Sequence, residues 1–216
     1  MGNADQHPKE DLMQPTLTGL LVFMIASESG NPYTYRHAVN VAELAVMFGR
    51  SLSLDAQLIE SIRIGSLLHD IGKLSVPNEV LLKPGKLIAE ELSQIQCHPV
   101  NGHQIVGPLD LTATMRHIIL FHHERWDGTG YPSGLKGKEI PLAGRIAAVA
   151  DVFDALTTER SYKSAWSVDR AFEHIREEAG RQFDPACVAA FEKCRDSVVE
   201  VMRICPDPEQ SEREVA

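Results

Sequence analysis

Two pairs of adjacent residues carry side chains that can bind metal ions. His69 is followed directly by Asp70, and His122 directly by His123. Imidazole nitrogens and carboxylate oxygens both ligate divalent cations, and the two oxygens of one carboxylate can bridge two ions. Neighbouring positions on a helix lie about 100° apart around its axis, so the two histidines can converge on one ion. The pairs therefore predict a metal site.

Three further residues could complete this set from other helices. They are His37, His98 and Asp151, and the apolar spacing around His37 predicts that it lies on the buried face of a helix. Mixed imidazole and carboxylate ligands suit iron, manganese, zinc or nickel better than calcium or magnesium. Two such ions about 3.5 to 4 Å apart would activate a hydroxide and hold a phosphate for in-line attack. The set indicates phosphoester hydrolysis.

The elements that must position these residues are predicted to be helices. Apolar residues recur at helical spacing, and no hairpin signature of the Asn-Gly type interrupts them. We expect helices over residues 16–27, 55–71 and 142–157, and at least two more in the C-terminal third. Three further helices are expected to begin near Thr34 as N-cap, near 89 and near 111, the second running past 98 and the third into His122. Gly72 is expected to end the helix over 55–71. Residues 76–85 and 127–141 are predicted to be loops.

Composition limits the class of protein. The chain has 216 residues, 44% of them apolar and 24% charged, which indicates a packed domain. We expect a tail and leading helix over 1–30, one domain over 31–205 and a polar tail over 206–216. The apolar run Leu20 to Ala26 has seven residues, too few to span a bilayer. A net charge of −9 argues against binding a long nucleic acid. Without a secretory signal or a CxxC pair, a cytoplasmic protein with reduced cysteines is expected.

Two motifs resemble a known family. His69 to Lys73 resembles the HD signature of the HD phosphohydrolase superfamily, and His122 to Pro132 resembles the longer HHExxDGxGYP signature of its HD-GYP branch. The similarity continues through Ala148 to Thr157 and Arg160 to Lys163, and in all it spans about residues 31–190. The first motif is weakly specific, whereas the second, at this spacing, is highly specific.

The resemblance implies an all-α HD-domain bundle with an irregular GYP loop and a cyclic di-GMP phosphodiesterase activity. The product would be linear pGpG, or GMP if hydrolysis continues. It implies two divalent transition metals, iron or manganese first and zinc or nickel next. One metal would be held by His37, His69, Asp70 and Asp151, and the other by Asp70, His98, His122 and His123, with Asp70 and a hydroxide bridging the two. Substrate contacts would come from Lys73 at the scissile phosphate, from Arg160 and Lys163 at the other phosphate, from Asp154, and from the loop wall of Gly130, Tyr131 and Pro132.

One position departs from the family pattern. Members with three metals are expected to carry a glutamate four residues before the first histidine ligand, where this chain has Tyr33. The sequence therefore predicts two metals. Binding of a third ion stays an open alternative, because Glu28 lies near the expected glutamate position in the sequence, although not at it.

Other interpretations of these residues stay open. Lys73 could stabilise a helix dipole, Arg160 and Lys163 could be surface charges, and Asp154 could orient a ligand without touching substrate. The sequence assigns structural or surface positions to three other histidines: His103, His117 and His174. The alternative functions are hydrolysis of another cyclic dinucleotide or nucleotide, and a weakly active module that senses a nucleotide or docks a protein. A homodimer or protein partner is compatible with either.

Overall fold

The computed structural model describes Gly19, residues 32–159 and residues 164–204. Within these ranges the chain is helical and has no β-strand, and one isolated bridge joins Ala179 to Phe183. The predicted all-α class is confirmed. No helix in the described part is long and apolar enough to cross a membrane. The domain limits of 31 and 205 stay a prediction, and the expected leading helix over 16–27 lies outside the described residues apart from Gly19.

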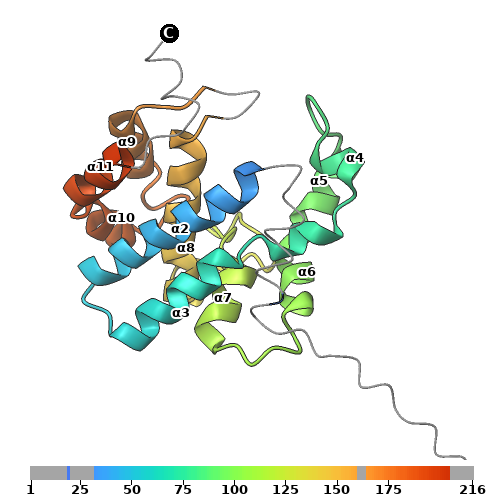
Figure 1. The fold of residues 1–216 in the computed structure, drawn as a ribbon, viewed down its shortest axis with the longest axis horizontal. Helices are drawn as coiled ribbons and strands as arrows, with labels where there is room; N and C mark the ends of the chain where they lie inside the picture. The colour runs from blue at the N-terminus through green and yellow to red at the C-terminus, as the bar shows by residue number, and fades with distance from the viewer. Residues whose placement is uncertain (1–18, 20–31, 160–163, 205–216) are drawn as a thin grey trace, which may run out of the picture.

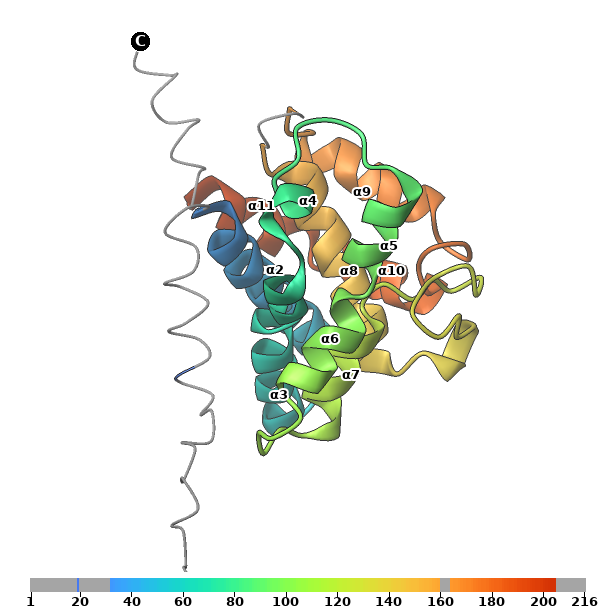
Figure 2. The same cartoon turned by 90° about the vertical axis from the view of Figure 1, so that its right-hand side faces the viewer.

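The described elements are all helices, and the longest segment between two of them is the loop over residues 122–136. They are α2 (Pro32–Ser51), α3 (Ala56–Leu67), the 3-10 helix η2 (Ile71–Ser75), α4 (Asn78–Leu81), α5 (Ala89–Gln96), α6 (His98–Ile105), α7 (Ala113–Phe121), the 3-10 helix η3 (Gly137–Glu139), α8 (Leu142–Thr157), α9 (Val168–Glu177), α10 (Pro185–Glu192) and α11 (Arg195–Ile204). Figure 1 shows α8 in the middle of the bundle, with α9, α10 and α11 on one side and α4, α5 and α6 on the other. In the view turned by 90° in Figure 2, α6 and α7 lie next to each other.

Helix α8 forms the centre of the core. It begins at Leu142 and ends at Thr157, as predicted, and most of its residues are buried because α2, α7 and α9 pack around it. Phe153 of α8 contacts the rings of Phe172 and Phe191 at centroid distances of 4.9 and 5.2 Å. Fully burying each such side chain stabilises the fold by about 1.5 to 3 kcal/mol. The core thereby fixes the helix that carries Asp151.

The chain leaves α3 earlier than predicted. Asp55 caps the helix by accepting the Leu58 N–H, but α3 ends at Leu67 rather than at Ile71. Beyond it the backbone tightens into bonds three residues apart, from Ile71 N to Leu68 O at 3.0 Å and from Lys73 N to Asp70 O at 2.9 Å. His69 and Asp70 therefore lie in a buried turn between α3 and η2, and not on the helix itself.

Gly72 allows two backbone segments to pack closely, whereas the sequence predicted that it ends a helix. A Cβ at this position would lie 1.9 Å from the His98 carbonyl oxygen and 2.5 Å from the Gly102 nitrogen. These atoms belong to the backbone of α6, which packs directly on η2. Gly72 thus allows α6, with His98 at its first position, to approach the turn that carries Asp70.

Three other expected boundaries were wrong. The helix predicted from Thr34 begins at Pro32. The loop predicted over 76–85 contains the short helix α4. The helix predicted to run from 89 past 98 is two helices that break at Cys97, because Pro99 has no N–H to continue α5.

Replacing Gly72 by alanine is expected to destabilise the protein by about 3 kcal/mol or more, since the added methyl group meets rigid backbone rather than a movable side chain. The matched control is Gly49→Ala in α2, where the new Cβ would lie 3.4 Å from a side-chain atom of Ile59. Alanine is the better helix former, so this control should stay within about 1 kcal/mol of the wild type or gain stability. Urea unfolding of both variants measures the difference, and equal stabilities would contradict the close approach.

Candidate metal centre

All seven predicted ligands lie together where several helices end. His37 comes from α2, His98 from the start of α6, His122 and His123 from the end of α7, and Asp151 from α8, around the turn of His69 and Asp70. Ligand atoms of six of them form two groups, each within 4.8 Å: Asp70, His98, His122 and His123 in one, and His37, His69 and Asp70 in the other, with Asp151 in neither. Asp70 belongs to both groups.

The two oxygens of Asp70 face different imidazoles. Oδ1 lies 3.2 Å from His98 Nε2 and 3.9 Å from His122 Nε2. Oδ2 lies 3.3 Å from His69 Nε2 and 3.8 Å from His37 Nε2. Asp151 Oδ1 adds a second carboxylate 3.1 Å from His37 Nε2. The carboxylate of Asp70 therefore occupies the position of a bridge between two neighbouring ligand groups.

Three of the imidazoles are held by the same interaction, a hydrogen bond from Nδ1 to a backbone carbonyl. His69 Nδ1 lies 2.6 Å from Ser66 O, His98 Nδ1 lies 2.8 Å from Ile95 O, and His122 Nδ1 lies 3.0 Å from Ile118 O. A carbonyl oxygen can only accept, so each Nδ1 carries the proton and donates it. The acceptors belong to the last turns of α3, α5 and α7. Two of these carbonyls also accept a backbone N–H, Ser66 O from His69 at 3.4 Å and Ile118 O from His122 at 3.1 Å, so the ring nitrogen is a second donor to them. Helix ends thus set both the tautomer and the orientation of three rings.

This arrangement fits a bound cation. In the tautomer with the proton on Nδ1, Nε2 of each ring carries a lone pair directed into the centre, and the Nε2 atoms of His98 and His122 lie only 3.1 Å apart. Within the described part of the chain, His69 Nε2 and Asp70 Oδ1 are buried and have no hydrogen-bond partner. Buried polar atoms without partners are costly. Divalent transition metals would satisfy both atoms and remove the repulsion between the lone pairs.

The protonation states also favour metal binding on one side of the centre. Burial lowers the pKa of His122, and burial lowers that of His123 to about 4, so both rings are neutral near pH 7. Burial alone would raise the pKa of Asp70, but the Lys73 ammonium beside it holds that pKa well below its usual range. His37 differs, because Asp151 and Asp154 outweigh its burial and raise its pKa to about 9. In the metal-free protein His37 is therefore a cation near pH 7.

Asp154 supports the centre from behind His37. It is 2% exposed, and its Oδ2 lies 2.6 Å from His37 Nδ1. Its other oxygen accepts hydrogen bonds from Asn40 Nδ2 at 2.8 Å and from Thr158 Oγ1 at 3.1 Å. These contacts favour the orienting role over the expected substrate contact, since both oxygens already have partners. A buried carboxylate behind a ligand histidine fixes its tautomer and raises its basicity.

The loop after His123 is held by buried polar contacts. Glu124 is 3% exposed and accepts the backbone N–H groups of Ser133 at 2.7 Å and Leu135 at 3.0 Å. Gly130 packs where a Cβ would lie 2.3 Å from the Arg125 nitrogen. Tyr131 consequently stacks on His123, with ring centroids 4.8 Å apart. Hydrogen bonds, close backbone packing and ring stacking thus hold the GYP loop against the end of α7.

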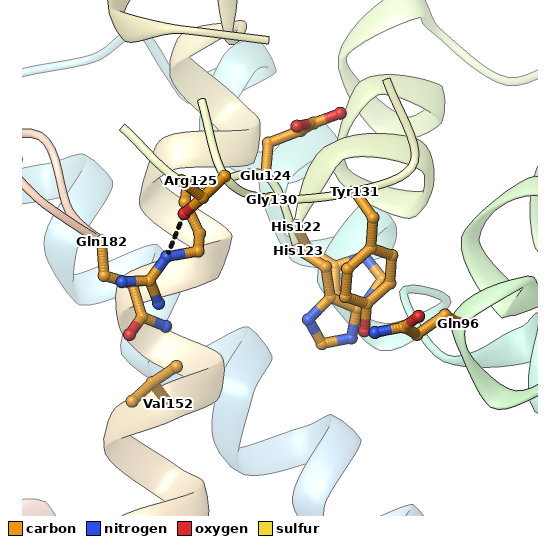
Figure 3. A pocket seen from close by; sticks show the side chains of 10 residues that line it. Gln96, His122, His123, Glu124, Arg125, Gly130, Tyr131, Val152 and Gln182 are labelled. Atoms are coloured by element: carbon orange, nitrogen blue, oxygen red, sulfur yellow. Dashed lines mark hydrogen bonds between the residues drawn. The ribbon is translucent and has the colours of Figure 1, made fainter. Parts of the chain in front are cut away.

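A cavity of about 280 Å³ opens beside this loop. Figure 3 shows His123 and Tyr131 on one side of it and Arg125 and Gln182 on the other, with Val152 of α8 nearby. The backbone carbonyl of Gln182 accepts the Trp126 N–H at 3.0 Å, which brings the segment before α10 against the motif. The cavity therefore adjoins the metal centre through His122 and His123.

The remaining predicted site residues have mixed outcomes. Lys73 Nζ lies 2.5 Å from Asp70 Oδ2, and its side chain is partly exposed at the edge of the centre. Arg160 and Lys163 lie outside the described residues. His117 packs on Phe121 and His174 on Trp166, away from the ligand groups, in agreement with a structural role. Sequence reasoning missed Arg125, Gln182 and Gln96 as cavity residues, and no spacing signal identifies them.

Comparisons with known proteins agree with this geometry. A family model described as HD domain matches residues 21–187. A cyclic di-GMP phosphodiesterase of Pseudomonas aeruginosa is 40% identical over 174 residues, which cover 80% of this chain and 42% of that protein. A 3'3'-cGAMP-specific phosphodiesterase of Vibrio cholerae is 42% identical over 167 residues, covering 77% of this chain and 36% of that protein. The chain spans about half or less of the length of these relatives.

A solved structure supports the fold. An HDGYP protein from Bdellovibrio bacteriovorus superposes with a TM-score of 0.62 at 21% identity, covering 82% of this chain and 60% of that one. At this identity the likeness bears on the fold alone. Together with the family model, it identifies the helical bundle described above as an HD-domain bundle.

Metal binding near pH 7.5 is expected to release a proton from His37, because its raised pKa of about 9 keeps it protonated until Nε2 must bind the ion. Metal affinity should therefore increase with pH and level off above about 9. Calorimetric titration with Mn(II) in buffers of different ionisation enthalpy counts the protons released.

Asp154→Asn removes a charge that raises the pKa of His37, so this variant should release fewer protons at the same pH. Glu43→Gln is the matched control, because Glu43 lies on the same helix but pairs with Arg63 at the surface. Equal proton release by the wild type and Asp154→Asn would contradict the assigned role of the carboxylate.

Proposed function

The chain belongs to the HD domain family, in its HD-GYP branch, and we propose that it is a metal-dependent phosphodiesterase that hydrolyses cyclic di-GMP. The observation that carries this proposal is the pair of buried ligand groups that share Asp70. A carboxylate shared by two imidazole groups is the arrangement needed for two adjacent ions that act on one phosphate.

The ligands divide between the two ions by position. His37, His69, Asp70 and Asp151 would hold the first, and Asp70, His98, His122 and His123 the second. The distances of Asp151 Oδ1 to His37 Nε2 (3.1 Å) and to His69 Nε2 (4.0 Å) support its assignment to the first ion. The mixed nitrogen and oxygen set favours iron or manganese, with zinc and nickel as alternatives.

When bound, the metals would activate a water molecule and neutralise the negative charge on the phosphate. Lys73 would bind an oxygen of the scissile phosphate, since its ammonium group already lies beside Asp70 at the exposed edge of the centre. Asp154 would keep His37 oriented, and Glu124 would hold the GYP loop against His123. Arg160 and Lys163 are proposed to bind the second phosphate.

The substrate is proposed from the relatives. The matched proteins from P. aeruginosa and V. cholerae are named for cyclic di-GMP and 3'3'-cGAMP, so a guanine-containing cyclic dinucleotide is the shared chemistry. Cyclic di-GMP is favoured, and hydrolysis is proposed to stop at linear pGpG because Tyr33 stands where a third-metal glutamate is expected.

A second candidate is hydrolysis of 3'3'-cGAMP, which the 42% identity to the V. cholerae enzyme favours. A weakly active sensing module is less well supported. A module that only binds a nucleotide has no need for seven metal ligands in register.

The direct test is anaerobic purification with Fe(II) or Mn(II), incubation with cyclic di-GMP or 3'3'-cGAMP, and chromatography of the products. We expect faster hydrolysis of cyclic di-GMP and accumulation of pGpG. Rapid formation of GMP would refute the inference from Tyr33, and faster hydrolysis of 3'3'-cGAMP would favour the second candidate. No product from the metal-loaded protein would reject the phosphodiesterase proposal.

Lys73→Met is expected to lower kcat for cyclic di-GMP by roughly 10² to 10³, the usual loss when one group that stabilises transition-state charge is removed. Lys83→Met is the matched control, because Lys83 has similar exposure and pairs with Glu91 on α5, outside both ligand groups. Metal content measured on each preparation separates a catalytic loss from a loss of ions. An equal kcat in the two variants would leave Lys73 with a structural role.

A further inference from the structure

The cavity beside the GYP loop has the chemistry of a nucleobase site. We propose that it binds the guanine next to the scissile phosphate and that Arg125 recognises this base. The inference rests on the proposed function, because it assumes a nucleotide whose phosphate lies at the metal centre. It adds the part of the site that selects the base.

The size and position of the cavity suit one base. Pockets for whole drug-sized ligands measure about 300 to 1,000 Å³. At about 280 Å³, this cavity is too small for a cyclic dinucleotide but adequate for a single ring system. His122 and His123 belong both to its wall and to one ligand group, so a base in the cavity would be attached to a phosphate at the neighbouring ion.

The walls offer a flat surface on one side and hydrogen-bonding groups on the other. Tyr131 is braced by its stack on His123, and Figure 3 shows both rings opposite Arg125 and Gln182. Val152 adds an apolar contact. Aromatic rings stack on any base, so this side favours binding but does not choose between guanine and adenine.

Arg125 can make that choice. Its Nε donates to Thr129 Oγ1 at 3.1 Å, and Nη2 contacts Glu178 at 3.4 Å, which fixes the guanidinium at the cavity. Among the described residues no hydrogen-bond acceptor pairs with Nη1. Guanine presents two acceptors, O6 and N7, on one edge, whereas adenine replaces O6 with an amino donor. A fixed arginine fork therefore favours guanine and opposes adenine.

Gln182 lies beside Arg125 in the same wall. Its backbone is used, because its carbonyl accepts the Trp126 N–H, but within the described part of the chain its side-chain amide has no hydrogen-bond partner. An amide both donates and accepts, so it can bind a second edge group of the base once Arg125 has set the orientation.

The test measures binding of GMP and AMP to the Mn(II)-loaded protein by calorimetry, so it does not depend on turnover. The wild type should bind GMP at least about fivefold more tightly than AMP, as expected for one arginine–guanine contact. Arg125→Gln should bring the two affinities to within about twofold of each other. Arg125→Lys should do the same, since it keeps the charge and loses the fork.

Arg181→Gln is the matched control. Arg181 also pairs with Glu178, at 2.6 Å, but its side chain is 65% exposed and lies outside the cavity. This variant should keep the preference for GMP. The proposal is overturned if the wild type shows no preference, if Arg125→Gln and Arg125→Lys retain it, or if Arg181→Gln loses it equally. Failure of the proposed function would appear separately, as absence of cyclic di-GMP hydrolysis by a wild type that still prefers GMP.

Discussion

The structure depends on how lone pairs are brought together around Asp70. Each of His69, His98 and His122 donates its Nδ1 proton to a carbonyl, which leaves Nε2 as an acceptor directed at the buried carboxylate or at another acceptor. Acceptors that face one another in a buried site repel and lose their hydration. The helical bundle supplies the packing energy that holds them there, and a divalent cation would turn the repulsion into ligation.

The bundle uses its own helix ends to prepare these ligands. Three helices end at the centre, and in each of them a carbonyl of the last turn accepts the Nδ1 proton of a predicted ligand histidine. Pro99 both ends α5 and leaves a carbonyl available to His98. Because it has no N–H, the Ile95 carbonyl that would have accepted it in a continuous helix accepts His98 Nδ1 instead. The missing N–H of Pro99 therefore accounts both for the end of α5 and for the orientation of the His98 ring.

Much of the centre could be predicted from the sequence because its ligands lie in two local motifs and on strongly periodic helices. The limits of α8 were predictable for the same reason. The role of Gly72 was not, since it depends on contact with the backbone of α6. For Asp154 the sequence left a substrate contact and an orienting role open, because its contacts with His37 and Asn40 of α2 join residues distant in the sequence. Arg125 lies inside the recognised motif, yet its cavity forms only when Gln182 and Val152 pack nearby. A local pattern carries no information about such contacts.

The separation of ligands from cavity residues bears on how substrates can differ within one family. A metal centre of imidazoles and carboxylates acts on the phosphate, which is the same in every cyclic dinucleotide, so its residues can stay constant when the base changes. The wall that faces Tyr131 contains Arg125 and Gln182, and neither of these two residues belongs to the predicted metal ligands. Arg125 pairs with Glu178, which follows α9, and Gln182 precedes α10. If Arg125 recognises the base as proposed, substitutions in this wall would alter base preference while leaving the ligand groups intact. The similarity of this chain to phosphodiesterases named for two different dinucleotides is therefore compatible with one shared centre and a variable adjoining wall.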